Sequence, residues 1–175
     1  MIDTPRLMLV PATRESLRAE LESPSRLAEV ARMDVSGEWP PELYDRDPIE
    51  FTLRRLESAP EQKNWWLYYF LMKQPRGAGL AIGCGGYKGP PDADATVEIG
   101  YSMVPEHRRQ GYATEAATGL VEAAFAHSDV MRVIAETLPS LSASIRVLEK
   151  CGFRLTGPGS DDGIIRYELR RSEWV

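Results

Sequence analysis

The sequence predicts an α/β fold of the α+β type, in which helices flank a central sheet and residues 1–175 form a single domain. Segments with the apolar alternation of strands occur on both sides of segments with apolar residues at helical spacing. A chain of 175 residues can also bury about 70% of its unfolded surface around one core without metal or disulfide staples. These two observations carry the prediction.

The first third of the chain predicts one strand followed by helices. Arg6–Val10, bounded by two prolines, is typical of a short strand near a sheet edge. Two consecutive helices are expected between Thr13 and Met33. Residues 34–47 are predicted to form a loop, and Asp47 is then expected to cap a helix over 48–58.

The middle of the chain predicts two neighbouring strands. Asn64–Met72 is apolar on both faces, which indicates a central strand that is covered on both sides. Leu80–Tyr87 follows as a strand with three glycines, whose missing side chains leave room for a bulge or for a closely approaching ligand.

The last third predicts a strand, a helix and a closing hairpin. Met131–Thr137 is expected to be the strand, and a helix should run from Ser140 to Cys151. Gly152 then suits the left-handed cap at the end of that helix. Phe153–Thr156 and Ile164–Leu169 should pair as the hairpin.

A strand, a basic loop and a helix are predicted over Thr96–Ala117. The apolar residues of the strand alternate with Thr96, Glu98, Gly100 and Ser102, so Glu98 points away from the apolar row. The first turn of the helix leaves backbone N–H groups unpaired at the positive end of the helix dipole, which attracts an anion. Gly111 allows close approach of the anion, Ala113 leaves the next turn unobstructed, and Arg108 and Arg109 add positive charge.

This loop is interpreted as a pyrophosphate site. The alternative, a surface turn with two solvated arginines, stays open on the sequence alone. Two competing phosphate motifs are missing from the sequence: neither the dinucleotide fingerprint Gly-x-Gly-x-x-Gly nor the triphosphate loop with Gly-Lys-Ser/Thr occurs.

Composition limits the partners. The formal net charge of −5 argues against nucleic acid, because a surface that binds phosphate backbones needs a basic excess, and it favours cationic acceptors. The longest apolar run, Trp65–Met72, is far shorter than the roughly 20 residues of a membrane helix. The residues from Met1 to Arg6 show no secretion signal. We therefore expect a cytoplasmic protein without a nucleic-acid or membrane partner, and we leave a homodimer open.

The cysteines and histidines are expected to be structural. Cys84 and Cys151 should be reduced and buried, and neither has a basic partner at a spacing typical of a nucleophile. His107 and His127 are the two histidines of the chain and show no metal-ligand spacing, so we predict no metal site.

The segment Arg108-x-x-Gly111-x-Ala113 resembles the Arg/Gln-x-x-Gly-x-Gly/Ala loop of the GNAT N-acetyltransferase superfamily. In that family the loop binds the pyrophosphate of acetyl-coenzyme A. The order of the predicted elements also resembles the GNAT fold, which implies a mixed, mostly antiparallel central sheet. The resemblance implies a cofactor site at Met103, Val104, Arg108, Arg109, Gln110, Gly111, Tyr112, Ala113 and Thr114.

A second segment, Thr137–Phe153, resembles the ribosomal-protein N-terminal acetyltransferase (Rim-type) branch, which has Pro-x-Asn-x-x-Ser-x-Arg-Val-Leu-Glu-Lys-x-Gly-Phe there. Two positions depart from the family. Leu141 replaces the asparagine expected near the pantetheine arm. Leu148 stands where many relatives have the tyrosine that protonates the leaving thiolate, which excludes a tyrosine acid at that position.

The resemblance implies an N-acetyltransferase that uses acetyl-CoA as co-substrate, without a metal, to acetylate a primary amine. A protein or peptide N-terminus is the leading acceptor. A small-molecule amine, such as a polyamine or aminoglycoside, and a non-catalytic acyl-CoA-binding sensor are the alternatives.

The chemistry requires a base, an oxyanion donor and an acid. Glu98 is the predicted base, directly or through water, although an ion-paired glutamate fits the position equally well. A backbone N–H near Met103 or Val104 is expected to hold the oxyanion. Ser144 matches the serine of the family and is the predicted donor to sulfur, although a serine in a helix more often bonds locally. Trp39 either stacks on an acceptor or plugs the core edge.

Overall fold

The structure is a computed structural model that describes residues 1–174. One nine-stranded sheet organises these residues, in the order β1-β2-β4-β5-β6-β7-β9-β8, with β3 pairing on β5. The strands are β1 (Ile2–Asp3), β2 (Leu7–Pro11), β3 (Asp34–Val35), β4 (Leu67–Met72), β5 (Leu80–Tyr87), β6 (Thr96–Met103), β7 (Arg132–Thr137), β8 (Arg154–Pro158) and β9 (Ile165–Arg170). The helices are α1 (Arg14–Glu22), α2 (Pro24–Ala31), α3 (Arg46–Ser58), α4 (Tyr112–Phe125) and α5 (Ser142–Lys150).

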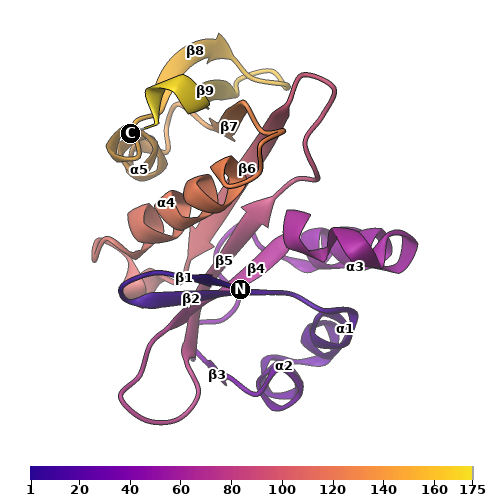
Figure 1. Cartoon of the computed structure of the whole chain (residues 1–175). Helices are drawn as coiled ribbons and strands as arrows, with labels where there is room; N and C mark the ends of the chain where they lie inside the picture. Colours follow the sequence, from indigo (N-terminus) through magenta and orange to yellow (C-terminus); the bar gives the residue numbers. More distant parts are fainter. Residues whose placement is uncertain (175) are drawn as a thin grey trace.

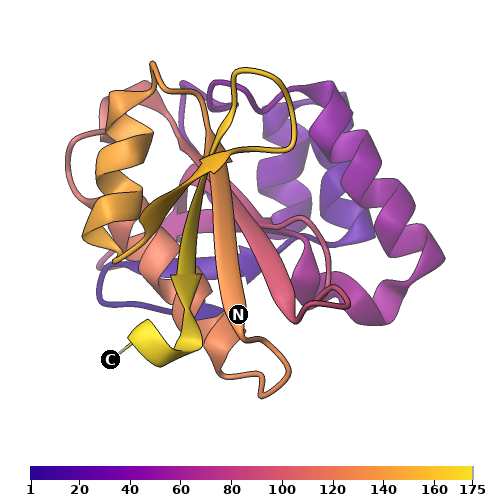
Figure 2. The same cartoon turned by 90° about the horizontal axis from the view of Figure 1, so that it is seen from above.

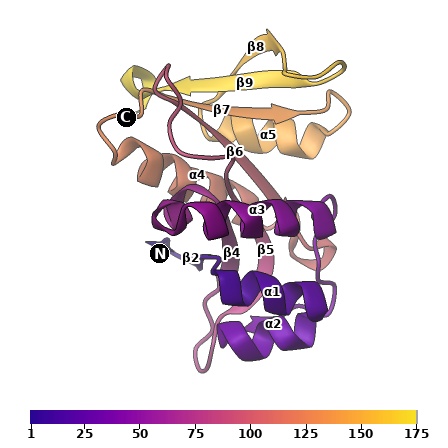
Figure 3. The same ribbon diagram turned by 90° about the vertical axis from the view of Figure 1, so that its right-hand side faces the viewer.

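Helices cover both faces of the sheet. Helices α1, α2 and α3 lie on one side, and α4 and α5 lie on the other (Figures 1 and 2). The view in Figure 3 looks onto the side that carries α1, α2 and α3. The pairs β6–β7 and β3–β5 are parallel, whereas the other neighbouring strands are antiparallel. The predicted fold class, a mixed and mostly antiparallel sheet flanked by helices, is confirmed.

The core forms where the apolar faces of the sheet and helices meet. Strand β4 lies between β2 and β5, and its residues Tyr68–Leu71 are buried, as its apolar sequence predicts. Helix α4 packs on the sheet through small and branched residues that are fully buried, among them Ala116, Leu120 and Ala124. Gly119 brings this helix close to the N-terminal residues, because a Cβ there would lie 2.9 Å from the Thr4 side chain.

Strands β6 and β7 diverge partway along their length. Their ladder ends at the pair Ile99–Ala135, whereas β6 continues to Met103 along β5 and β7 continues to Thr137 along β9. Val104 donates its N–H to Ile82 on the β5 side, so the alternation of the ladder turns the backbone groups of Tyr101 and Met103 toward the gap.

Several predicted boundaries were wrong. The short strands β1 and β3 were not predicted, and β3 lies within the expected loop. Helix α3 begins two residues earlier than predicted, because Asp45 rather than Asp47 caps it and accepts the Asp47 N–H at 3.2 Å. A 3-10 helix over Pro60–Trp65 takes the start of the predicted strand.

The predictions for Gly152 and for the two cysteines are confirmed. Gly152 has a φ of 87° at the end of α5. Cys84 and Cys151 are both buried and unbridged. The bulge expected near the glycines of β5 is present, because the register with β4 shifts between the pairs Phe70–Gly83 and Leu71–Ala81. A Cβ at Gly85 would also collide with the main-chain oxygen of Gly100 on β6. Within residues 1–174, no helix is long and apolar enough to span a bilayer.

Candidate active site

A cavity of about 710 Å³ lies where β6 and β7 diverge. Its walls come from the ends of these two strands, from the start of α4, from α5, and from the β3–α3 loop at residues 36–45. No group of three or more potential metal ligands occurs in the described part of the chain.

The start of α4 presents a row of free backbone donors to this cavity. Gly111 is the N-cap residue with a φ of 83°, and no side chain caps the helix. The first intrahelical bond runs from Glu115 N–H to Gly111 oxygen at 3.0 Å. Within residues 1–174, the N–H groups of residues 109 to 114 have no hydrogen-bond acceptor. Such a row of donors at the positive end of a helix dipole suits a phosphate group.

The two arginines of this loop differ in their surroundings. Arg108 donates through Nε to the Met103 oxygen at 3.0 Å and pairs with Glu42 at 3.0 Å. The Arg109 side chain is exposed and forms no ion pair with the described residues. Its φ of 60° is a left-handed conformation that costs a non-glycine residue roughly 1 kcal/mol. Arg109 is therefore the guanidinium that remains available to an anion.

Arg6 holds the loop in place from the N-terminal end of β2. Its Nη1 donates to the Gln110 oxygen at 2.9 Å, and its Nε donates to Glu115 Oε2 at 2.6 Å. The guanidinium also lies 4.4 Å from the ring centroid of Tyr112. These contacts fix both sides of the free N–H row, so the donors are arranged before any ligand binds. No local pattern points to Arg6, which lies far from the loop along the chain.

The structure brings most of the predicted cofactor residues together. The cavity is lined by Met103, Arg108, Arg109, Gly111, Tyr112, Ala113 and Thr114. Gln110 does not line it, because its side-chain amide turns back to the Glu106 oxygen at 3.0 Å. Val104 is fully buried, and its N–H donates to Ile82 at 2.9 Å. The proposed oxyanion donor at Val104 was therefore wrong, whereas Met103 faces the gap.

The two predicted catalytic residues lie on opposite faces of β6. Ser144 lines the cavity from the first turn of α5, and its main-chain oxygen accepts the Tyr101 hydroxyl at 3.3 Å. Glu98 lies on the other face, where it pairs with Lys88 and its side chain is 20% exposed. It does not line the cavity itself.

Glu98 is nevertheless next to open space. Gly100, the following residue on the same face of β6, lines the cavity, and a Cβ there would meet nothing within 4 Å. In the sequence, Gly100 is only one position of the alternating strand pattern. The open space on this face of Gly100 can hold an acceptor amine between the side chains of Glu98 and Ser102.

The β3–α3 loop closes this side of the cavity. Glu42 and Leu43 line it, and the Glu42 oxygen accepts the Ser102 hydroxyl at 2.7 Å. The buried Glu20 anchors the loop by accepting from Trp39 Nε1 at 2.9 Å and from the Tyr44 hydroxyl at 3.0 Å. Trp39 is only 8% exposed and does not line the cavity, so the packing interpretation of Trp39 is correct.

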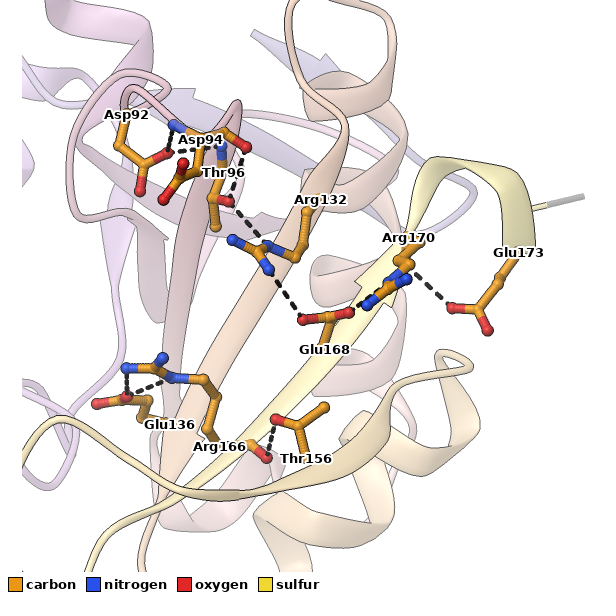
Figure 4. A network of polar contacts seen from close by, with 10 residues as sticks. All are labelled: Asp92, Asp94, Thr96, Arg132, Glu136, Thr156, Arg166, Glu168, Arg170 and Glu173. Atoms are coloured by element: carbon orange, nitrogen blue, oxygen red, sulfur yellow. Dashed lines mark hydrogen bonds and ion pairs between the residues drawn. The ribbon is translucent and has the colours of Figure 1, made fainter.

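Glu136 adds a second carboxylate to the wall of the cavity, from β7. Burial raises its pKa, but hydrogen bonds from Ser160 and Arg166 outweigh burial and leave the pKa below its usual value. Arg166 of β9 forms an ion pair with Glu136. Next to this pair on the same face, Glu168 forms ion pairs with both Arg132 and Arg170 (Figure 4). The sequence shows Glu136 only as one polar position of a strand, which is a weak signal.

Comparison with known proteins identifies the family. Residues 6–154 match the family described as "Acetyltransferase (GNAT) domain". The uncharacterized N-acetyltransferase YjdG of Bacillus subtilis is 26% identical over 156 residues, which cover 89% of this chain and 90% of that protein.

Two solved structures share the fold. A putative ribosomal-protein-serine acetyltransferase from Vibrio cholerae has a TM-score of 0.66 at 16% identity, with 97% of this chain and 96% of that one covered. The aminoglycoside acetyltransferase AAC(6')-Ib in complex with coenzyme A has a TM-score of 0.63 at 18% identity, with 95% and 96% covered. The family match covers most of the sequence, and the chain belongs to the GNAT acetyltransferase family.

Proposed function

We propose that residues 1–175 form one acetyltransferase domain that moves the acetyl group of acetyl-CoA to a primary amine, by direct transfer in a ternary complex. One observation carries this proposal: the N–H groups of residues 109 to 114 are unpaired, and all of these residues except Gln110 line a cavity that continues to the gap between β6 and β7. An anion-binding helix end joined to a gap in a sheet suits a ligand with a diphosphate and a long polar arm.

The diphosphate would bind at the start of α4. Free amides donate to its oxygens, and Arg109 supplies a charge that no carboxylate in the described residues neutralises. Arg146 and Lys150 of α5 add positive charge to the opposite wall. The pantetheine arm would run along β6, where the backbone groups of Tyr101 and Met103 face the gap.

The amine would approach from the Gly100 face of β6. Glu98 takes the proton of the attacking amine, directly or through one water, and the Met103 N–H donates to the oxyanion of the tetrahedral intermediate. The proton for sulfur comes from the opposite face of β6, where Ser144 and Tyr101 line the cavity. No covalent enzyme intermediate is required, since the buried Cys84 and Cys151 lie outside the cavity wall.

The leading acceptor is a protein or peptide N-terminus, as in the Rim-type branch. The likeness of Thr137–Phe153 to that branch supports it, and so does the fold shared with the Vibrio cholerae protein, which is named a putative ribosomal-protein-serine acetyltransferase. A chain N-terminus has a pKa near 8, so it needs less help from a base than a lysine-like amine with a pKa near 10.4.

A small polycationic amine is the second candidate. The formal net charge of −5 favours a cationic acceptor. Glu42 and Glu136 line the cavity, where each pairs with an arginine that a cationic acceptor would have to displace. AAC(6')-Ib, which shares the fold, is named as an aminoglycoside acetyltransferase.

Thiol release from acetyl-CoA across a panel of peptides, polyamines and aminoglycosides tests the proposal. We expect acceptor-dependent release of coenzyme A, with the product mass raised by one acetyl group. A protein that binds acetyl-CoA in calorimetry yet acetylates no member of the panel would instead be an acyl-CoA sensor, and the proposed function would be wrong.

A further inference from the structure

We propose that Tyr101 is the acid that protonates the departing thiolate of coenzyme A, an inference that rests on the proposed function. Leu148, one turn beyond Ser144 on α5, lines the cavity with an apolar side chain, so the proton has to come from another group. Tyr101 of strand β6 places a phenol on the side of the cavity that α5 lines.

The position of Tyr101 suits this role. It lies on β6 beyond Ile99, the last residue that pairs with β7, and it lines the cavity. Its hydroxyl reaches the main-chain oxygen of Ser144, in the first turn of α5 and one turn before Leu148. The distance of 3.3 Å is longer than the 2.7–2.8 Å typical of O–H···O bonds, so the hydroxyl can turn to a sulfur atom at little cost.

Three other side chains of the cavity wall are less suitable than Tyr101. The Tyr112 hydroxyl points away, since it bonds to Met72 sulfur at 3.2 Å. Ser144 lines the cavity, but an aliphatic hydroxyl is a weaker acid than a phenol. Leu148 carries no proton to donate. Among the described residues of the wall on the α5 side, Tyr101 is the phenol that remains.

The proton balance closes without a further reactant. The amine nitrogen bonds to the thioester carbon, and collapse of the intermediate breaks the C–S bond and leaves the electron pair on sulfur. Sulfur takes the phenolic proton as the carbon–sulfur bond breaks. Glu98 passes the proton that it took from the nitrogen to water, and the phenolate regains a proton from water, so the products are the amide and the thiol and both side chains return to their starting forms.

Burial keeps the Tyr101 hydroxyl protonated in the resting site. Burial raises the pKa of Tyr101 well above its usual value, and the contact with Ser144 offsets this only in part. A phenol with a raised pKa rests in the neutral form that can donate, and it is a weaker acid than a free tyrosine, so the transfer of its proton to sulfur is slow. The rate should therefore depend on proton transfer in the step that expels sulfur.

Tyr101→Phe is the direct test, because it removes only the hydroxyl. We expect kcat to fall about 100-fold, at the low end of general-acid effects. The Kd for acetyl-CoA and the KM for the acceptor should stay within twofold, and the solvent deuterium isotope effect on kcat should change. A purely structural role would instead weaken acetyl-CoA binding or lower the unfolding temperature without changing the isotope effect.

Tyr87→Phe is the matched control. Tyr87 is also a buried tyrosine whose hydroxyl donates to a main-chain oxygen, that of Leu120 at 2.6 Å, but it does not line the cavity. Its loss should lower stability and leave kcat unchanged. Ser144→Ala tests the rival donor, because the main-chain oxygen that positions Tyr101 remains.

The outcomes separate the two proposals. If the wild-type protein transfers acetyl groups and Tyr101→Phe does so within threefold of the same kcat, or if Ser144→Ala alone abolishes transfer, the role of Tyr101 is overturned and the proposed function stands. A wild-type protein that acetylates nothing overturns both. A drop confined to kcat in Tyr101→Phe supports the assignment.

Discussion

Arg6 and Glu115 join the N-terminal end of β2 to the first turn of α4 across 109 residues of sequence, with Nε and Oε2 2.6 Å apart. The Glu115 side chain is 12% exposed and also accepts the Arg6 N–H at 2.6 Å and the Thr4 hydroxyl at 2.7 Å. This pair fixes the helix end that carries the free N–H groups. Its contribution to stability should depend on pH.

Glu115→Gln should destabilise the protein by about 1.5–3 kcal/mol at pH 7, the usual cost of losing a hydrogen bond to a charged group. Burial raises the pKa of Glu115, but hydrogen bonds from Thr4 and Arg6 outweigh it, so the pKa lies below its reference value of 4.5. The ionised carboxylate therefore stabilises the fold above pH 4.5 and loses this effect as the pH falls through the lower folded pKa. Urea unfolding at pH 7 and at several values below 4.5 measures the difference.

Glu122→Gln provides the control, since Glu122 is an exposed residue of the same helix. It should change stability by less than about 0.5 kcal/mol. A gap between wild type and Glu115→Gln that stays constant down to the lowest pH would contradict a role for the ionised form.

Glu98→Gln should lower kcat sharply in neutral buffer and less at high pH. The amine needs a base at neutral pH, whereas solvent removes its proton once the pH approaches the pKa of the amine, about 8 for a chain N-terminus. The pH profile of kcat measures this. Glu168→Gln, on the same face of the sheet but outside the cavity, should leave the profile unchanged. An unaltered profile in Glu98→Gln would remove the base role.

Gly100→Val should block the acceptor without affecting acetyl-CoA. A Cβ at Gly100 meets nothing within 4 Å, so the variant should fold, but its side chain fills the open volume beside Glu98. We expect the acceptor KM to rise at least tenfold while calorimetry shows an unchanged Kd for acetyl-CoA. Gly37→Val, which also has room for a side chain but lies outside the cavity wall, should change neither constant. Equal acceptor kinetics in both variants would place the acceptor elsewhere.

The sequence predicted those features whose cause is local. The alternation in Thr96–Met103 indicated the strand β6, and the glycine at 111 marked the helix end that follows it. The strands β1 and β3 were not predicted because each has only two residues, too few to show a periodic pattern. The cap of α3 was misplaced because Asp45 and Asp47 are equally good caps, and only the backbone geometry separates them.

The sequence predicted the part of the site at the start of α4, where a phosphate is expected to bind. It did not predict the contacts between residues that are distant in the sequence. Arg6 meets Gln110, and Tyr101 meets Ser144, across more than forty residues in each pair, which no local pattern reports. Val104 was misjudged because its N–H is turned to β5 by the strand register, and register follows from pairing rather than from composition.

The central claim is that the start of α4, together with Arg109, holds a diphosphate. Calorimetric titration of Arg109→Glu with acetyl-CoA and with S-acetylpantetheine, which lacks the diphosphate, tests it most directly. The matched control is Arg14→Glu, which makes the same change in net charge at an exposed position of α1. We predict that Arg109→Glu weakens acetyl-CoA binding at least tenfold, or by about 1.4 kcal/mol or more, and leaves S-acetylpantetheine unaffected. Equal acetyl-CoA affinity in wild type and Arg109→Glu would contradict the account.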